Sequence, residues 1–140
     1  MEENDIYDIL KVILDLIKSK DFVWRLEGSA NLRVQDVAVS VNDLDITTNN
    51  DGINLFRIFL KKFIVKDFYN EKGWNSLKCY INGFEVEINS YNNKQFQMFN
   101  KIKRITWNGL VIPILPLKNA REFYRLIDRK EKVDLIEKYL

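Results

Sequence analysis

The sequence predicts an α/β (α+β) protein in which a mixed β-sheet of about five strands is flanked by helices. Apolar residues recur at helical spacing near both ends of the chain, and alternating apolar runs that are typical of strands fill the middle. Two Asn-Gly pairs each join two such runs, which is a strong signal for a β-hairpin. Because hairpins pair antiparallel strands, a doubly wound parallel sheet is not expected.

The two ends of the chain are expected to be helical. An N-terminal helix is predicted over residues 5–19, with Asp5 as its N-cap or as an acid of its first turn. C-terminal helices are predicted over residues 116–139. A chain of 140 residues is long enough to bury a core, so we expect one domain that spans residues 1–140.

Strands and one more helix are expected between these ends. A helix is predicted from Ile53 to Phe63, after a turn signal at residues 49–52. Alternating valines predict a strand from Val37 to Val41 that continues with the same period through residues 43–47. The other expected strands are residues 22–26, 63–69, 77–81, 84–88, 102–107 and 110–115, and a polar loop is expected over residues 70–75.

The residue types that are missing exclude several classes of active site. The chain has 22 Lys and Arg against 20 Asp and Glu, no His, and a single cysteine, Cys79. Catalytic triads, Cys-His pairs, imidazole or thiolate zinc sites and an intramolecular disulfide are therefore excluded. Catalysis would rest on carboxylates, lysines, hydroxyls, backbone amides or a hard cation such as Mg²⁺, which prefers oxygen ligands. Cys79 lies in an apolar run and is expected to be an inert core thiol.

Charge and hydrophobicity also bear on location and partners. The formal net charge is +2, so the overall charge does not indicate nucleic-acid binding. No apolar run approaches the roughly 18 residues that span a bilayer. The acidic start of the chain lacks the basic residues of a signal peptide. We therefore expect a cytoplasmic protein with no membrane partner.

A Gly-Ser pair follows the first predicted strand and precedes a short predicted helix. Gly28 permits close approach of the backbone, and free N–H groups at a helix start attract phosphate. Gly28 and Ser29 are therefore candidate phosphate ligands. Most Gly-Ser pairs are simple turns, which is the alternative interpretation of this pair.

Two pairs of acids have the spacing of neighbours on one face of a strand. Asp43 and Asp45 would lie about 6.6 Å apart along their strand, with the alternating residues facing the core. Carboxylates so placed repel each other unless a cation lies between them. A solvated edge or turn is the alternative for this pair alone. Glu85 and Glu87 repeat the spacing on a later strand, where the alternative is the polar face of a half-exposed hairpin.

In combination these features resemble the nucleotidyltransferase fold of the DNA polymerase beta superfamily. That family's pattern is a strand that ends in Gly followed by Gly or Ser, then Asp-hydrophobic-Asp-hydrophobic, then a third carboxylate between apolar residues. The matching residues are Leu26-Glu27-Gly28-Ser29, Asp43-Leu44-Asp45-Ile46 and Val86-Glu87-Ile88. Glu27 is a departure, because many members have an apolar residue before the Gly.

The resemblance extends to small single-domain members that are similar to the lincosamide-type nucleotidyltransferases. It covers about residues 22–139. Three further segments carry it, namely residues 83–87 (Gly-Phe-Glu-Val-Glu), 111–117 and the stretch from Tyr124 to Lys132 with its Tyr-Arg-x-x-x-Arg-x-Glu-Lys pattern.

The resemblance implies transfer of an NMP from an NTP, with ATP as the expected donor, to an acceptor hydroxyl, with release of pyrophosphate. Asp43 and Asp45 would hold two Mg²⁺ ions, and Glu87 would be a third ligand or the general base. Gly28 and Ser29 would hold the β- and γ-phosphates. Glu85 competes with Glu87 for the third position, and Glu87 is preferred because both of its neighbours are apolar and non-aromatic, as in the family strand.

The resemblance does not name the acceptor. Family members of this size often complete the acceptor pocket with a second subunit, so a homodimer is one expectation. The alternative function is a non-enzymatic nucleotide-binding module, or an antitoxin-like member of a two-protein system whose partner is a small helical protein. Arg121, Arg125 and Arg129 recur every fourth residue and would share one helix face. They would contact phosphate or acceptor or, the favoured interpretation, pair with neighbouring acids in solvent.

Overall fold

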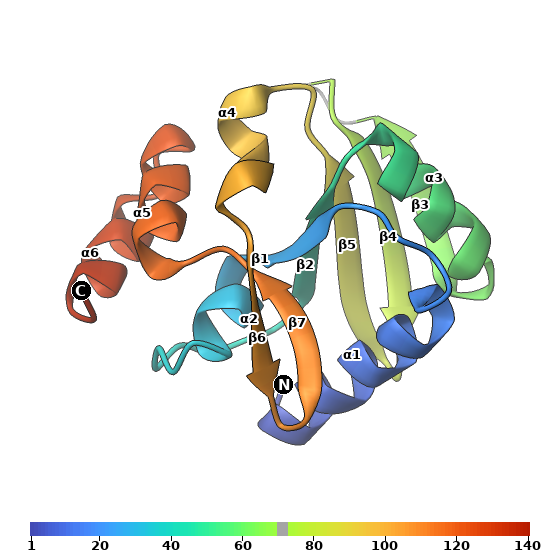
Figure 1. The fold of residues 1–140 in the computed structure, drawn as a ribbon, viewed down its shortest axis with the longest axis horizontal. Helices are drawn as coiled ribbons and strands as arrows, with labels where there is room; N and C mark the ends of the chain where they lie inside the picture. Colours follow the sequence, from blue (N-terminus) through green and yellow to red (C-terminus); the bar gives the residue numbers. More distant parts are fainter. Residues whose placement is uncertain (70–72) are drawn as a thin grey trace.

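The structure is a computed structural model that describes residues 1–69 and 73–140, so residues 70–72 of the polar loop expected over residues 70–75 lie outside the described residues. Figure 1 shows the fold. In chain order the elements are α1 (Glu3–Ile17), β1 (Trp24–Glu27), α2 (Gly28–Arg33), β2 (Leu44–Thr48), α3 (Asn50–Phe59), the 3₁₀-helix η1 (Lys61–Phe63), β3 (Ile64–Tyr69), β4 (Asn75–Ile81), β5 (Phe84–Ser90), α4 (Lys94–Gln97), the 3₁₀-helix η2 (Phe99–Lys101), β6 (Lys103–Trp107), β7 (Leu110–Ile114), α5 (Leu117–Leu126) and α6 (Lys130–Glu137).

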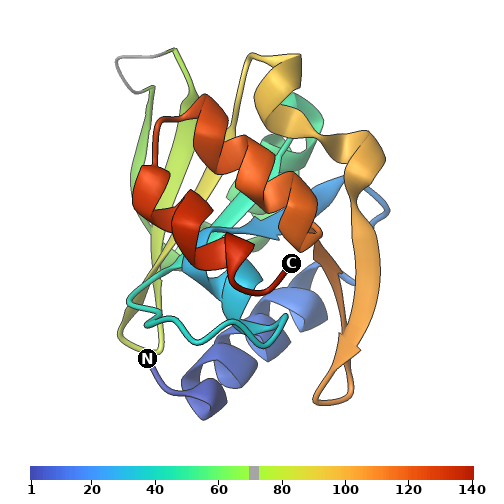
Figure 2. The same cartoon turned by 90° about the vertical axis from the view of Figure 1, so that its left-hand side faces the viewer.

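Five strands form one mixed sheet, as predicted. Their order is β1-β2-β5-β4-β3, in which β2 and β5 are parallel and every other neighbouring pair is antiparallel. The two Asn-Gly turns close the predicted hairpins β4–β5 and β6–β7. The β6–β7 hairpin forms a separate two-stranded ribbon that lies against β1 (Figure 2).

Helix α1 begins two residues earlier than expected and ends at Ile17. Glu2 is its N-cap, and the carboxylate of Asp5 accepts a hydrogen bond from the backbone N–H of Glu2 at 2.8 Å. Asp5 is therefore the N3 acid of a capping box and not the N-cap itself. Of the helices in the described part of the chain, none is long and apolar enough to cross a bilayer.

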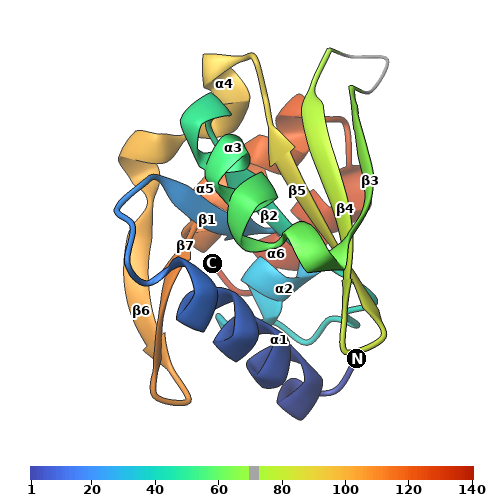
Figure 3. The same ribbon diagram turned by 90° about the vertical axis from the view of Figure 1, so that its right-hand side faces the viewer.

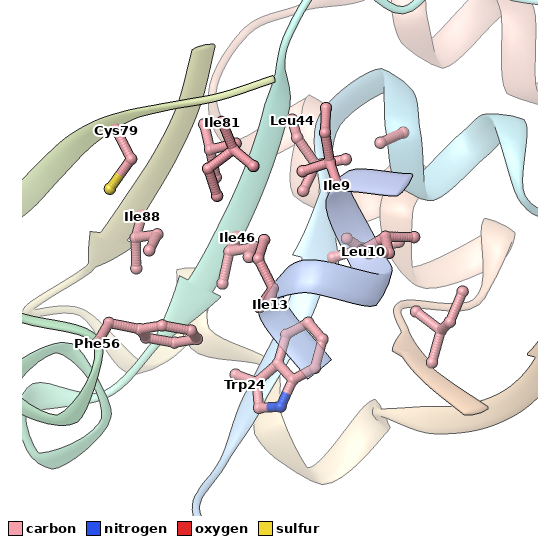
Figure 4. Close-up of a cluster of buried hydrophobic side chains, with 14 of the residues drawn as sticks. Ile9, Leu10, Ile13, Trp24, Leu44, Ile46, Phe56, Cys79, Ile81 and Ile88 are labelled. Atoms are coloured by element: carbon pink, nitrogen blue, oxygen red, sulfur yellow. The ribbon is translucent and has the colours of Figure 1, made fainter. Parts of the chain in front are cut away.

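Helices α1 and α3 cover one face of the sheet (Figure 3). Ile9 and Ile13 of α1 and Phe56 of α3 are fully buried and pack with residues of the central strands. Figure 4 shows how these side chains converge with Leu44 and Ile46 of β2. Alternate residues of β2 therefore point into this core, and the residues between them must point to the other face. Cys79 is part of the same core, and burial raises the pKa of its thiol to about 11, as an inert thiol requires.

A second cluster lies on the other side of the sheet, beneath α5 and α6. It consists of buried residues from α2, α5, α6 and the segments that follow α2, β5 and β7, namely Leu32, Val37, Tyr91, Leu115, Ala120, Phe123, Tyr124, Val133 and Ile136. In Figure 1 these two helices lie at the end of the molecule near β1 and α2, away from β3 and β4. The second face of the sheet is thus covered over β1 and β2 by these helices.

The strand predicted from Val37 to Val41 is wrong. Val37 and Val41 are each 1% exposed, but the segment has no strand partner. The Val37 N–H donates to the carbonyl of Leu32, and the Ala38 N–H donates to the hydroxyl of Tyr139. Alternating burial thus arises in an irregular segment whose backbone groups bond to a helix end and a side chain. The helix expected from Ile53 to Phe63 ends at Phe59 and is followed by η1.

Candidate functional site

Three acidic side chains lie level with one another across neighbouring strands. Glu27 of β1 is in register with Asp45 of β2, and Asp45 is in register with Glu87 of β5. Residues opposite each other on adjacent strands point to the same face. That face also carries Arg25, whose guanidinium lies 5.4 Å from the ring centroid of Phe123 in α5. We call this face, on the side of α5 and α6, the site face.

Asp45 is the central acid of the row. Burial raises the pKa of its carboxyl to about 8, and the negative charges that add to this rise are those of Asp43, Glu27, Glu87 and Glu85. Asp43 lies one residue before β2 begins, and Leu44 between the two acids is fully buried on the opposite face. Asp43 and Asp45 therefore lie close together on the site face, where the charges that act on Asp45 are those of neighbouring acids.

Gly28 lies directly against Asp45. Its φ of +68° is in the left-handed region, and a Cβ added to it would lie 2.5 Å from Oδ2 of Asp45. Only glycine avoids both that collision and the strain of a left-handed residue. Gly28 also begins α2, so the first N–H groups of that helix lie next to the acids. Ser29, the second residue of α2, extends the candidate phosphate site toward α6.

Glu85 and Glu87 lie on the same face of β5 but have different partners. Oε1 of Glu85 lies 3.3 Å from Nζ of Lys78, with which it forms an ion pair. Glu87 is the residue in register with Asp45, and its Oε1 accepts a hydrogen bond of 3.2 Å from the side-chain amide of Asn89. Glu87, and not Glu85, therefore lies directly opposite Asp45.

Sequence reasoning missed the buried network around Glu27. Thr47 and the hydroxyl of Tyr91 each donate a hydrogen bond of 2.6 Å to its carboxylate. Nη2 of the fully buried Arg25 lies 3.6 Å from Oε1 of Glu27 and donates to the carbonyl of Phe96 at 3.0 Å. Burial, and then the negative charge of Glu27, raise the pKa of Tyr91, so Tyr91 stays protonated as a donor. The available signal was Glu27 itself. Many family members have an apolar residue before the Gly, so this position is expected to be buried, and a buried Glu needs hydrogen-bond partners.

Lys132 is a second residue that sequence reasoning passed over. Its Nζ donates a hydrogen bond of 3.1 Å to the hydroxyl of Ser29, so α6 places a cation beside the start of α2. The available signal was its place at the end of the Tyr-Arg-x-x-x-Arg-x-Glu-Lys segment. A lysine here could balance phosphate charge at the same point as the helix N–H groups.

The prediction that three arginines share one helix face is wrong for Arg129. Helix α5 ends at Leu126, and Arg129 is the N-cap of α6. The favoured pairing with acids is found for two of the three. Nη2 of Arg125 lies 3.2 Å from Oε1 of Glu137, and Nε of Arg129 lies 2.5 Å from Oε1 of Glu131.

The acids present suit Mg²⁺, although they do not form a finished cage. Within residues 1–69 and 73–140, no group of three or more acidic or cysteine side chains is arranged to hold a metal ion by itself. Mg²⁺ commonly takes one or two carboxylates and completes its shell with water and substrate phosphates. Asp43 and Asp45 supply that number of carboxylates. Burial and, after it, neighbouring negative charge raise the pKa of Asp45, and a divalent cation would neutralise that charge.

No protein-family model and no curated protein matches the chain, but several solved structures are similar to it. A suspected nucleotidyltransferase from Thermotoga maritima has a TM-score of 0.77 and 22% identity, over 99% of this chain and 94% of that one. The lincosamide antibiotic adenylyltransferase LnuA, with lincomycin bound, has a TM-score of 0.67 and 12% identity, over 98% of this chain and 97% of that one.

The antibiotic-resistance factor ANT(2″)-Ia is also similar. Its complex with adenylyl-2″-tobramycin has a TM-score of 0.62 and 9% identity, over 95% of this chain and 87% of that one. At these identities the likeness concerns the arrangement of the backbone, and all three structures share it over nearly the whole of this chain. The chain therefore has the nucleotidyltransferase fold, which the resemblance of its motifs predicted.

Proposed function

We propose that the chain is a Mg²⁺-dependent nucleotidyltransferase that moves an NMP group from an NTP, with ATP as the expected donor, to a hydroxyl of an acceptor. The observation that carries this proposal is the contact between Gly28 and Asp45. It joins a glycine turn at a helix start to Asp45, which supports a site where a phosphate and a metal ion would meet.

Each residue has a distinct role in the proposed reaction. Asp43 and Asp45 hold the metal ions, and Gly28 and Ser29 contact the β- and γ-phosphates through backbone N–H groups and a hydroxyl. Bound Mg²⁺ supplies neutralisation of charge on the phosphate oxygens. Lys132, hydrogen-bonded to Ser29, adds positive charge beside the leaving group.

The proposed reaction is an in-line displacement at the α-phosphorus. The acceptor oxygen forms a bond to the α-phosphorus while the bond from that phosphorus to the oxygen bridging to the β-phosphate breaks. Pyrophosphate leaves with the electron pair of the broken bond. The hydroxyl proton passes to Glu87 or to water. The chain has no histidine, so the proposed proton acceptor is a carboxylate or water.

The similar structures support the class of reaction. LnuA is an adenylyltransferase for lincosamide antibiotics, and the ANT(2″)-Ia complex holds an antibiotic that carries an adenylyl group. Both are thus consistent with an NTP donor and a hydroxyl acceptor in this fold.

The test is incubation of the protein with labelled ATP, Mg²⁺ and a broad acceptor set that includes cell lysate. Wild-type protein should transfer label, and the double variant Asp43→Asn with Asp45→Asn should not. Asp8→Asn, which removes an exposed acid from α1, is the control and should behave as wild type. Equal labelling by wild type and double variant would overturn the assignment.

The binding-only alternative is separated by calorimetry. Mg²⁺-dependent binding of a non-hydrolysable ATP analogue without transfer to any acceptor would favour a nucleotide-binding module or an antitoxin-like protein. Absence of such binding would count against both functions, because both require Gly28, Ser29 and the acids to hold a nucleotide.

A further inference from the structure

Part of the site face is left open. On β4, the residues that point to α1 and α3 are buried, with Leu77, Cys79 and Ile81 at most 1% exposed. The residues between them point to the site face and are accessible, with Tyr80 48% exposed. Figure 1 shows α5 and α6 near the opposite end of the sheet from β3 and β4. The open area is continuous with the acids, because β4 is the next strand after β5.

Four side chains make up this open area, and we call them the platform: Lys66 and Phe68 of β3, and Lys78 and Tyr80 of β4. Lys78 is in register with Glu87, and Lys66 is in register with Lys78. They therefore extend the row of Glu27, Asp45 and Glu87 across the remaining strands. Nζ of Lys66 lies 4.6 Å from the ring centroid of Phe68. The platform thus combines two cations with two aromatic rings.

One of the two platform lysines, Lys66, has no acidic partner within the described residues. Like charges directly opposite each other on adjacent strands destabilise a sheet, and Lys66 and Lys78 are such a pair. Glu85 forms an ion pair with Lys78, but Lys66 has no ion pair among residues 1–69 and 73–140. A bound anion would offset the repulsion between the two lysines.

We infer that the platform binds the acceptor, and that the acceptor is a nucleotide, free or at the end of a single strand; this rests on the proposed function. Strands lie about 4.8 Å apart, which places Lys78 about 10 Å from Asp45 in the same row. A ribose hydroxyl at the acids therefore leaves the acceptor's phosphate within reach of the lysines. Its base stacks on Tyr80, because exposed aromatic rings bind bases without regard to sequence.

The test measures binding of a fluorescent single-stranded RNA by anisotropy, with Mg²⁺ and a saturating non-hydrolysable ATP analogue that fills the donor site. Lys66→Gln should weaken binding and lower the slope of log affinity against log salt by about 0.7, the value for one lost phosphate contact. Tyr80→Ala should weaken binding roughly tenfold, whereas Tyr80→Phe keeps the ring and should bind as wild type. Lys62→Gln is the matched control, because Nζ of Lys62 also lies over an aromatic ring, that of Phe63, but in η1.

The competitors in this assay distinguish the sources of the nucleotide. Displacement of the RNA by a nucleoside monophosphate, a DNA strand or an RNA strand supports the inference and ranks the three sources. If the ATP analogue binds but tobramycin displaces the probe and nucleotides do not, the inference is overturned while the proposed function stands. RNA binding that Lys66→Gln and Tyr80→Ala leave unchanged would also overturn it. Failure of the ATP analogue to bind in calorimetry would overturn the proposed function instead.

Discussion

A Cβ on Gly28 would lie 2.5 Å from Oδ2 of Asp45, well inside van der Waals contact. Gly28→Ala is therefore expected to displace Asp45 as well as to strain the backbone. Gly109→Ala is the matched control, because Gly109 has a φ of +82° and nothing within 4 Å of the added Cβ. We expect each variant to lose about 1–2 kcal/mol of unfolding free energy in urea from left-handed strain. Gly28→Ala should lose nucleotidyl transfer, whereas Gly109→Ala should retain it. Equal activity in the two variants would show that the contact has no functional role.

Asp45→Asn should stabilise the metal-free protein at high pH. The folded pKa of Asp45 is raised from 3.8 to about 8, so its protonated form favours folding. That stabilisation is complete below pH 4, declines as pH rises, and is lost above pH 8. At pH 9 the Tm of the variant should therefore exceed that of wild type by roughly 3 °C or more. A change of about 1 kcal/mol in unfolding free energy shifts the Tm by a few degrees. Near pH 4 the difference should vanish. A constant difference at both values would assign the effect to packing, and Asp8→Asn serves as the exposed control.

Binding of Mg²⁺ should release a proton at neutral pH. Asp45 is mostly protonated at pH 7 in the metal-free protein, because its pKa is about 8, and a metal ligand must be ionised. Calorimetric titrations with Mg²⁺ and the ATP analogue in two buffers of different ionisation enthalpy should report up to one proton released. Raising the pH from 6 to 9 should tighten metal binding. Proton uptake, or an affinity that does not depend on pH, would contradict a role of Asp45 as ligand.

Glu87→Gln and Glu85→Gln form a matched pair on β5. Glu87 lies in register with Asp45, whereas Glu85 forms an ion pair with Lys78. We expect Glu87→Gln to lower kcat by about 10²-fold or more, since a general base contributes about 10²–10⁴-fold. Glu85→Gln should lower it much less. Initial rates with saturating ATP and Mg²⁺ measure both, and the reverse order would assign Glu85 as the third carboxylate.

Tyr91→Phe should destabilise the protein while Thr47 remains as the other donor to Glu27. The lost hydrogen bond of 2.6 Å leaves a buried carboxylate oxygen without a donor. Such a group costs about 1–3 kcal/mol, which urea unfolding can measure. Tyr80→Phe, at an exposed position, is the control and should leave the unfolding free energy unchanged within error. Equal stability of both variants would show that water replaces the missing donor.

Local chemistry explains which elements the sequence predicted. At both hairpin turns, Asn and Gly adopt positive φ angles, as at Asn82 (+54°) and Gly83 (+83°), so the residue types themselves define the turn. Val37 and Val41 alternate in burial as a strand would, but alternation carries no information on where the backbone hydrogen bonds go. Arg129 leaves the predicted helix because the chain turns at Asp128, whose φ is +60°.

The predicted acids were identifiable because their spacing is local, but their arrangement depends on strand register. Glu27 and Asp45 are opposite each other only because β1 and β2 pair as they do, and no pattern in either strand fixes that register. Lys132 reaches Ser29 only after α6 packs over α2. Residues that act through contacts between distant elements were therefore missed, whereas residues within one motif were named.

The parallel pairing of β2 with β5 has a consequence for how the protein matures. Parallel neighbours cannot be joined by a tight turn, so the chain passes through α3, β3 and β4 before Glu87 can reach Asp45. Closing such a long loop costs entropy that local hairpins do not pay. The β4–β5 hairpin can therefore form early, whereas Asp45 and Glu87 come together only when that hairpin docks on β2. The proposed activity should therefore appear late in folding, when the sheet is complete.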